Sequence, residues 1–242
     1  MILRRLSLRS LTYGARGAVR KLAVAAALAG ALAPAPAPAA AGITLAALGD
    51  SLTQGYGLPP EDGLVPRLQA WLRARGHEVT VLNAGVSGDT TAGGRSRVAW
   101  TLEGGADAMM VALGGNDLLR GIDPAASRAN LDAILAEAGA RDVPVLLVGI
   151  SAPGNYGPDY KAAFDAMFPE LAAAHGALYH PGFFTAFAGA GADDPAAMRR
   201  FMQPDGLHPS AEGVARIVEE IGPAVEDLLA RATERATAQT PR

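Results

Sequence analysis

Three residue types that together perform nucleophilic catalysis occur at suggestive places in this chain. The apolar run 43–48 is typical of a strand buried in a parallel sheet, and Ser51 follows just after Gly49 ends it. Open α/β folds carry their active sites at that carboxyl edge of the sheet. A serine hydroxyl is a weak nucleophile, so chemistry at Ser51 requires a base, an orienting acid and oxyanion donors. Taken alone, a serine after a glycine turn is equally typical of a helix cap.

The base and its acid are predicted near the other end of the chain, at Asp205 and His208. A carboxylate three residues before a histidine accepts the imidazole Nδ1 proton, which leaves Nε2 free to accept from a serine. Of the four histidines, only His208 has an acidic partner in the same turn and a proline, Pro209, that would hold the loop. The other three have settings typical of surface or structural residues: His77, His175 and His180.

The elements that must position these residues alternate between strands and helices, which predicts a parallel sheet with helices on both faces. Apolar runs predict five strands, over 43–48, 79–82, 108–113, 143–150 and 177–179. Helical periodicity predicts helices over 61–75, 94–103, 124–140, 160–174 and 211–231. The carboxyl ends of the strands should gather Ser51, the glycine-rich loop at Gly85 and Asn116 at one edge, because the connections are short and right-handed.

The first 41 residues are predicted to be an export signal rather than part of the fold. Residues 1–21 carry six basic and no acidic side chains, and the apolar run 22–33 is too short to span a bilayer. The Ala/Pro segment 34–41 ends in small residues, as a signal peptidase requires. We expect general secretion, cleavage after Ala39 or, preferably, Ala41, and a periplasmic or secreted protein without a stable membrane anchor.

The remaining residues, 42–242, are predicted to form one domain with a frayed polar tail from about Ala232. Subtracting the six basic residues of the signal from 21 leaves 15 against 24 acidic residues, a net charge of −9. A domain this acidic, whose one lysine is Lys161, is a poor candidate for binding nucleic acid. The absence of cysteine excludes disulfides, thiolate metal sites and a cysteine nucleophile.

Other catalytic and cofactor motifs are missing from the sequence. The residues around Ser87 lack the closing glycine of a G-x-S-x-G nucleophile elbow. Gly55 and Gly57 are followed by two prolines rather than by the third glycine of a dinucleotide loop. No cluster of His, Asp and Glu has metal-ligand spacing. We therefore expect neither a metal nor a cofactor.

Four short blocks, in order, resemble the four blocks of SGNH (GDSL) hydrolases. The blocks are GDSL at 49–52, Gly85 after the second strand, GGND at 114–117 and DGLH at 205–208. More narrowly, residues 49–58 (GDSLTQGYGL), 83–91 (NAGVSGDTT) and 155–157 (NYG) resemble the bacterial periplasmic arylesterase, lysophospholipase and acyl-CoA thioesterase I subgroup. The resemblance covers essentially all of residues 42–242, and it implies a flavodoxin-like three-layer α/β/α sandwich around a five-stranded parallel sheet.

The resemblance implies that Ser51 is the nucleophile, His208 the base and Asp205 its orienting partner. It also implies an oxyanion hole made of the backbone N–H groups of Ser51 and Gly85 and the side-chain amide of Asn116. The family logic gives no chemical step to Asp50 and Asp117, and their expected role is to bond loop amides so that the turns keep their shape.

The implied activity is hydrolysis of short- to medium-chain acyl or aryl esters, with thioesters and lysophospholipids as further substrates. Apolar residues near the blocks are expected to line the acyl site: Leu118, Leu119, Ile122, Met202 and Leu207. Phe183 is a further candidate for this wall, whereas Phe184 and Phe201 are expected to belong to the core.

Two other functions remain open on the sequence. A carbohydrate or peptidoglycan O-deacetylase is one, since other SGNH branches have that activity, although the chain has only 5% aromatic residues to bind sugar rings. A non-catalytic acyl-binding protein is the other. An intact set of Ser51, Gly85, Asn116, Asp205 and His208 argues against it, because binding alone needs no Asp–His pair.

Overall fold

The computed structural model describes residues 42–188 and 198–239. The expected signal peptide, residues 1–41, lies outside the described residues, and the chain divides into two units with a boundary at Ala40 and Ala41. None of the helices in 42–188 and 198–239 has both the length and the apolar character needed to cross a membrane.

Five parallel strands form the central sheet, in the order β2-β1-β3-β4-β5, which confirms the predicted sheet. They are β1 (Ile43–Gly49), β2 (Val79–Gly85), β3 (Ala108–Ala112), β4 (Val145–Val148) and β5 (Leu178–His180). Because β1 lies between β2 and β3, the register pairs Gly49 with Gly85 on one side and with Ala112 on the other. The ends of three strands therefore meet directly below Ser51.

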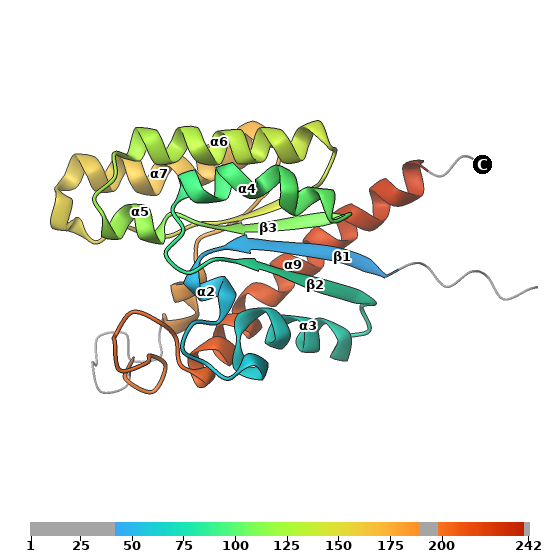
Figure 1. The fold of residues 1–242 in the computed structure, drawn as a ribbon, viewed down its shortest axis with the longest axis horizontal. Coiled ribbons are helices and arrows are strands. Elements are labelled where there is room, and N and C mark those ends of the chain that lie inside the picture. The colour runs from blue at the N-terminus through green and yellow to red at the C-terminus, as the bar shows by residue number, and fades with distance from the viewer. Residues whose placement is uncertain (1–41, 189–197, 240–242) are drawn as a thin grey trace, which may run out of the picture. The chain divides into compact units, whose positions relative to one another are not determined.

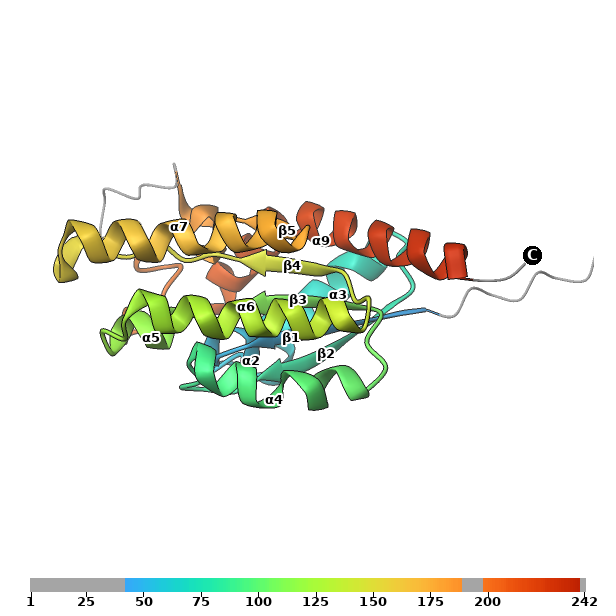
Figure 2. The same ribbon diagram turned by 90° about the horizontal axis from the view of Figure 1, so that it is seen from above.

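Helices cover both faces of the sheet and complete the predicted three layers (Figures 1 and 2). One face carries α3 (Leu64–Ala74) and α9 (Ala211–Gln239), and the other carries α4 (Thr91–Glu103), α6 (Pro124–Ala140) and α7 (Pro158–His175). Two short helices stand at the carboxyl edge of the strands, α2 (Ser51–Gln54) and α5 (Gly115–Leu119). Single 3₁₀ turns occupy Pro60–Asp62, Gly154–Tyr156 and Phe183–Phe187.

The core lies in two apolar layers, one on each face of the sheet. Alternate residues of β1 point to opposite faces, so that Leu45 contributes to the layer under α3 and α9, and Leu48 to the layer under α4, α6 and α7. Both side chains are fully buried. A strand buried on both faces reads as a continuous apolar run, which is why this segment was recognisable in the sequence.

The structure corrects several predicted boundaries: β2 continues to Gly85 rather than residue 82, and α4 begins at Thr91 rather than residue 94. Helix α3 begins at Leu64 rather than at residue 61, because the 3₁₀ turn and an extended Gly63 precede it. Strand β4 is shorter than the predicted 143–150. The frayed tail predicted from Ala232 is wrong for the part that the structure describes, since α9 continues to Gln239 and buries Ala232.

Candidate active site

Ser51 is the first residue of α2, directly after the tight end of β1. Gly49 has no room for a side chain, because a Cβ there would lie 2.0 Å from Thr53 Oγ1 as α2 folds back over the strand. Asp50 caps the helix, since its Oδ1 accepts the Leu52 N–H at 3.0 Å. The N–H of Ser51 at the first helical position has no intrahelical acceptor and remains available to a ligand.

Ser51, His208 and Asp205 form a continuous chain of hydrogen bonds. The Ser51 Oγ lies 2.9 Å from His208 Nε2, and His208 Nδ1 lies 2.7 Å from Asp205 Oδ2. An ionised carboxylate only accepts hydrogen bonds, so Nδ1 carries the proton and Nε2 is the acceptor for the serine hydroxyl. The contact between Ser51 and His208 joins residues 157 positions apart in the chain. The structure thus brings together the three residues expected to form a triad.

Local bonds fix Asp205 in its role. Its Oδ1 accepts the backbone N–H groups of Leu207 at 2.9 Å and His208 at 3.0 Å. These bonds, led by the backbone N–H of His208 and followed by its side chain, lower the pKa of Asp205 from 3.8 to about 2. The carboxylate is therefore ionised at neutral pH, and it holds the ring in one orientation.

The loop of His208 is itself anchored. The Gln203 N–H donates to the His208 carbonyl at 2.8 Å, and the Gln203 side-chain amide donates to the carbonyls of Tyr56 and Pro209. The ring of Tyr56 lies 4.7 Å from the His208 ring, centroid to centroid. Gln203 and Tyr56 were not identified from the sequence, because neither type nor spacing marks them as partners of a histidine.

Asn116 stands on α5 and points toward the same edge. Gly114 precedes the helix with φ +122°, a conformation that only glycine adopts readily. At Gly115 a Cβ would lie 3.3 Å from Asp50 Oδ2, so the second glycine lets the carboxylate approach closely. The side-chain amide of Asn116 donates to Asp50 Oδ2 at 3.3 Å.

Gly85, the third expected oxyanion donor, does not lie where the resemblance implies. Its N–H donates to Asn83 Oδ1 at 3.0 Å, and it does not line the pocket around Ser51. A Cβ at Gly85 would lie 2.3 Å from the Gln54 backbone nitrogen, so glycine is needed there for packing against α2. Gly88, three residues on, lines the pocket instead. Its N–H has no acceptor among residues 42–188 and 198–239.

Two arginines hold the loop that carries Gly88. The Arg97 guanidinium donates to the carbonyl of Gly49 at 2.8 Å, to the carbonyl of Ala84 at 2.7 Å and to the Asp89 carboxylate at 2.7 Å. It therefore ties the ends of β1 and β2 to the glycine-rich loop. Arg120, just after α5, donates to the Gly88 carbonyl at 2.8 Å and fixes the orientation of that peptide.

The expected structural role of Asp50 and Asp117, bonding loop amides, is confirmed. Asp50 accepts the Leu52 N–H, and Asp117 accepts the Thr91 N–H at 2.8 Å. Asp117 also accepts from the hydroxyls of Thr91 and Ser127, which ties α5 to the start of α4 and to α6. Asp50 makes the additional bond to Asn116 described above.

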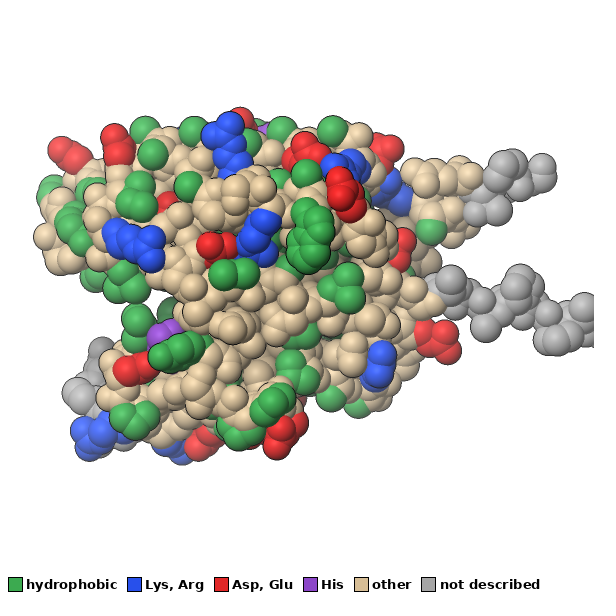
Figure 3. Space-filling model, in the orientation of Figure 1, with side chains coloured by type: hydrophobic (Ala, Val, Ile, Leu, Met, Phe, Trp, Pro, Cys, Tyr) green, Lys and Arg blue, Asp and Glu red, His purple; other side chains and the backbone are tan. Residues whose placement is uncertain are grey.

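A pocket of about 440 Å³ opens beside Ser51, and Figure 3 shows the hollow between two lips that carry hydrophobic side chains. Three of the expected acyl-site residues line it, Leu118, Leu119 and Leu207. Two do not. The carbonyl of Ile122 accepts from the Tyr160 hydroxyl at 2.9 Å, and Met202 packs against the core and bridges to Pro209. Further lining residues were not predicted: Tyr56, Ser87, Gly88, Ile150 and Pro153.

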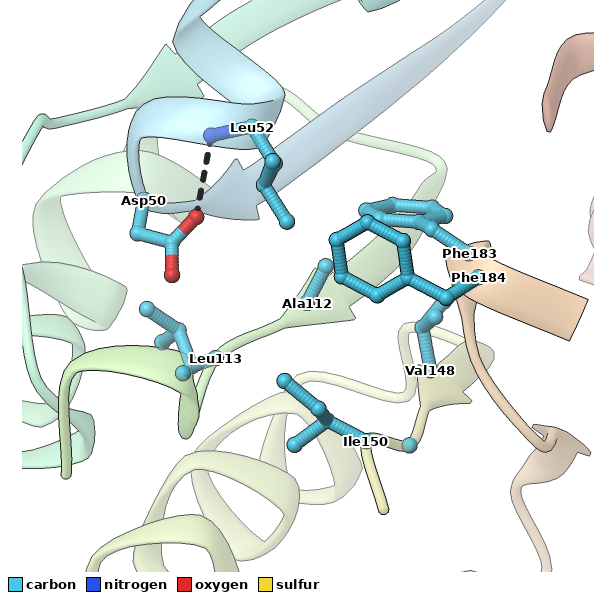
Figure 4. A pocket seen from close by; sticks show the side chains of 10 residues that line it. Asp50, Leu52, Ala112, Leu113, Val148, Ile150, Phe183 and Phe184 are labelled. Carbon is cyan, nitrogen blue, oxygen red and sulfur yellow. Dashed lines mark hydrogen bonds between the residues drawn. The ribbon is translucent and has the colours of Figure 1, made fainter. Parts of the chain in front are cut away.

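Phe184 also lines this pocket and is 37% exposed, so its expected place in the core is wrong. Phe201, 2% exposed, is in the core as predicted. Phe183 and Phe184 border a second, smaller cavity of about 30 Å³ at the ends of β3 and β4 (Figure 4). The two cavities adjoin, because both are lined by Asp50, Leu52, Gly115, Ile150 and Phe184.

Burial governs the electrostatics of Asp50. The residue is 5% exposed, and desolvation by burial raises its pKa from 3.8 to about 6. The bond from Leu52 N–H, the charge of His208 and the bond from Asn116 oppose this shift but do not cancel it. A carboxylate with so few partners in an apolar setting is costly, in contrast to the three-fold bonded Asp117.

Comparison with known proteins identifies related chains. Residues 47–216 match the model of the GDSL-like Lipase/Acylhydrolase family. Esterase TesA of Pseudomonas aeruginosa is 38% identical over 191 residues, 78% of this chain and 91% of that one. Thioesterase 1/protease 1/lysophospholipase L1 of Escherichia coli K12 is 32% identical over 191 residues, 78% and 86% of the two chains. The crystal structure of AlinE4, an SGNH-hydrolase family esterase, superposes with a TM-score of 0.62 at 40% identity, covering 78% of this chain and 97% of that one.

Asp50 should make the protein less stable as the pH rises. Between pH 3.8 and about 6 the folded chain holds a proton that the unfolded chain has released. The free energy of unfolding therefore falls as the pH rises through this window, by up to about 3 kcal/mol from Asp50 alone. Urea unfolding at pH about 4.5 and about 7.5 measures the change.

Asp50→Asn cannot ionise, so it should gain stability relative to the unsubstituted chain as the pH rises. Asp107→Asn is the control, because the Asp107 carboxylate is exposed and accepts the Thr44 N–H at 2.8 Å at the opposite edge of the sheet. A stability difference between Asp50→Asn and the unsubstituted chain that does not vary with pH would contradict the raised pKa.

Proposed function

The chain belongs to the GDSL-like lipase and acylhydrolase family and is a carboxylic ester hydrolase, and we propose that it works through Ser51, His208 and Asp205. The observation that carries this assignment is the unbroken chain of bonds from the Ser51 hydroxyl through His208 to Asp205, at 2.9 and 2.7 Å. That arrangement supplies a nucleophile with a base and an oriented imidazole, which acyl transfer requires.

In the first half of the reaction the Ser51 oxygen attacks the ester carbonyl carbon while His208 Nε2 takes the hydroxyl proton. The imidazolium that forms is stabilised by Asp205, which stays ionised because its pKa is about 2. The C–O bond to the leaving alcohol then breaks, and the imidazolium donates the proton to that oxygen. Water repeats the sequence on the acyl-enzyme, releases the acid and restores Ser51.

The oxyanion of each tetrahedral intermediate is stabilised by the N–H groups of Ser51 and Gly88 and by the side-chain amide of Asn116. Two observations favour Gly88 over Gly85: it lines the pocket, and the N–H of Gly85 already donates to Asn83. Arg120 bonds the Gly88 carbonyl and so presets that peptide before substrate arrives.

The substrates are esters with a short- to medium-chain acyl or aryl group. The lining of the pocket of about 440 Å³ supports this. Its walls are mostly aliphatic or aromatic, and its polar groups include those proposed for catalysis, Ser51, Asn116 and His208. Sequence relatives bear the names esterase and thioesterase 1/protease 1/lysophospholipase L1, which extends the proposal to thioesters and lysophospholipids. Sugar O-acetyl esters are the alternative, but the aromatic residues at the pocket are limited to Tyr56 and Phe184.

Substitution of the triad tests the mechanism. Ser51→Ala or His208→Ala should lower kcat on p-nitrophenyl butyrate by a factor on the order of 10⁶, because the triad residues act as a unit. Asn116→Ala should lower it by roughly 10²–10³, the usual cost of one oxyanion donor. An alkyl fluorophosphonate should label the unsubstituted chain and leave Ser51→Ala unlabelled.

A crystal structure of the labelled protein examines the oxyanion donors directly. The phosphoryl oxygen should lie within about 3.1 Å of the nitrogens of Ser51, Gly88 and the Asn116 amide. An oxygen bonded to Gly85 and not to Gly88 would contradict our assignment, and esterase activity retained in Ser51→Ala would overturn the mechanism.

The chain-length profile tests the substrate proposal. Hydrolysis of p-nitrophenyl esters should be fastest for short to medium acyl chains, with weaker activity on palmitoyl-CoA and none on acetylated xylan. Leu119→Ser should reduce kcat/KM for a medium-chain ester more than for the acetate, since each buried methylene contributes about 0.8 kcal/mol. Trp100→Ser, which removes a 74% exposed side chain on α4, is the matched control. Faster turnover of acetylated xylan than of any aryl ester would favour the deacetylase.

We also propose that residues 1–41 direct export by general secretion and are removed before Gly42, which leaves a periplasmic or secreted enzyme. The six basic residues followed by a short apolar run support this. Expression of the full chain in a Gram-negative host should give a periplasmic protein whose measured mass corresponds to a chain that begins at Gly42. A cell-associated chain of full length would contradict it.

A further inference from the structure

One side chain, Asp50, contacts both helices that carry the catalytic groups. Its Oδ1 accepts the N–H of Leu52 in α2, the helix of Ser51, at 3.0 Å. Its Oδ2 accepts the side-chain amide of Asn116 in α5, the proposed oxyanion donor, at 3.3 Å. Gly115 lacks a side chain at the point where Oδ2 comes closest to α5. The carboxylate thus lies between the helix of Ser51, the proposed nucleophile, and Asn116, the proposed donor to the oxyanion.

The bond to Asp50 determines which end of the Asn116 amide faces the substrate. A side-chain amide carries two N–H groups on one nitrogen and a carbonyl oxygen that only accepts. A carboxylate accepts and does not donate, so it selects the nitrogen of Asn116 and rejects the oxygen. With one N–H held by Asp50, the second N–H of the same nitrogen is directed elsewhere. A flipped amide would instead present its oxygen to the oxyanion and repel it.

Capping of α2 does not by itself explain why a carboxylate occupies this position. Serine, threonine and asparagine cap helices about as well as aspartate does. An ionised side chain 5% exposed, beside the apolar wall of Leu113, Ile150 and the two phenylalanines in Figure 4, is the costliest of these choices. Its raised pKa of about 6 is the sign of that cost. Residues that are unfavourable for stability and close to the chemistry are typical of functional positions.

We propose that Asp50 is a positioning residue, which holds the Asn116 amide with an N–H aimed at the oxyanion and ties that amide to the helix of Ser51. The proposal rests on the proposed function, in which Asn116 is an oxyanion donor. The charged groups near Asp50 are His208, whose charge favours the ionised carboxylate, and Arg97, which bonds the carbonyl of the preceding Gly49. The charge of His208 favours the ionised form that accepts from Asn116.

The test uses Asp50→Ser, alone and combined with Asn116→Ala, and measures kcat, KM and thermal unfolding of the purified residues 42–242. Serine keeps a cap for the Leu52 N–H but is too short to reach Asn116. Asp50→Ser should lower kcat on p-nitrophenyl butyrate about 10- to 100-fold with little change in KM, because a misplaced donor affects the transition state. Its unfolding temperature at pH about 7.5 should equal or exceed that of the unsubstituted chain.

The double variant distinguishes positioning from an independent effect. If Asp50 acts through Asn116, adding Asp50→Ser to Asn116→Ala should change kcat by less than about threefold. Asp107→Ser, which removes a carboxylate–backbone bond at the opposite sheet edge, should leave kcat unchanged in both backgrounds. The proposal would be overturned if Asp50→Ser lowered kcat by the same factor in the Asn116→Ala background as in the unsubstituted chain. Full activity of Asp50→Ser would overturn it as well.

Asp50→Asn is the second variant if Asp50→Ser does not fold. An asparagine at position 50 can present either its amide nitrogen or its oxygen to Asn116. The side chain of Asn116 is then no longer forced to point its nitrogen toward residue 50, and kcat should fall in the same way. If neither variant folds, the carboxylate serves the fold and the proposal is wrong. The proposed function is tested separately. If Ser51→Ala remains active, the mechanism is wrong whatever Asp50 does. If Ser51→Ala is inactive and Asp50→Ser is fully active, only the inference about Asp50 is wrong.

Discussion

The hydrogen bond between Ser51 and His208 is the contact on which the rest of the site depends. It joins the first helix after β1 to a loop 157 residues later, so it exists only if β1 and the start of α9 are fixed relative to each other. The sheet supplies that fixation: β1 is central, and α9 packs along the face that carries Leu45 and Met110. Gln203 then attaches the histidine loop to Tyr56, on the segment that follows α2. Packing against the sheet thus holds two residues that are far apart in sequence within hydrogen-bonding distance of each other.

Two buried aspartates near the site illustrate opposite uses of the same side chain. Asp117, 1% exposed, accepts a backbone N–H and two hydroxyls, so bonds from the protein replace its lost hydration. Asp50 has two donors and an apolar neighbourhood, and burial raises its pKa to about 6. The first arrangement stabilises the junction of α4, α5 and α6. The second arrangement accepts a loss of stability at the junction of α2 and α5, where the proposed nucleophile and oxyanion donor lie.

The sequence predicted the scaffold and the approach of Ser51, Asp205 and His208 well because both depend on strong local signals. Continuous apolar runs marked the strands, and the Asp205–His208 spacing marked a pair able to bond within one turn. The sequence pointed to Gly85 as an oxyanion donor, whereas we propose Gly88. The two glycines share one loop, and spacing does not reveal that the N–H of Gly85 is bonded to Asn83. Phe184 was misplaced because adjacent aromatics in a 3₁₀ turn point in different directions, one into the core and one into the pocket. The prediction that Ile122 and Met202 line the pocket was wrong for the same reason. The sequence shows which residues are close along the chain, whereas pocket lining depends on the direction of each side chain.

The pocket wall is assembled from separate loops, and this separates specificity from chemistry. Tyr56 follows α2, Leu119 ends α5, Pro153 lies after β4, Phe184 after β5 and Leu207 before α9. Tyr56, Leu119 and Pro153 belong to three different connections, whereas Phe184 and Leu207 share the connection between β5 and α9. Leu207 lies between Asp205 and His208, so the loops of Leu119 and Pro153 are the ones that can vary without moving β1 or the histidine loop. The proposed nucleophile and oxyanion donors, in contrast, lie on segments that Arg97 and Asp50 tie to strand ends. Chains named esterase and thioesterase both match this chain over most of their length, as expected of a scaffold whose pocket wall is made by loops.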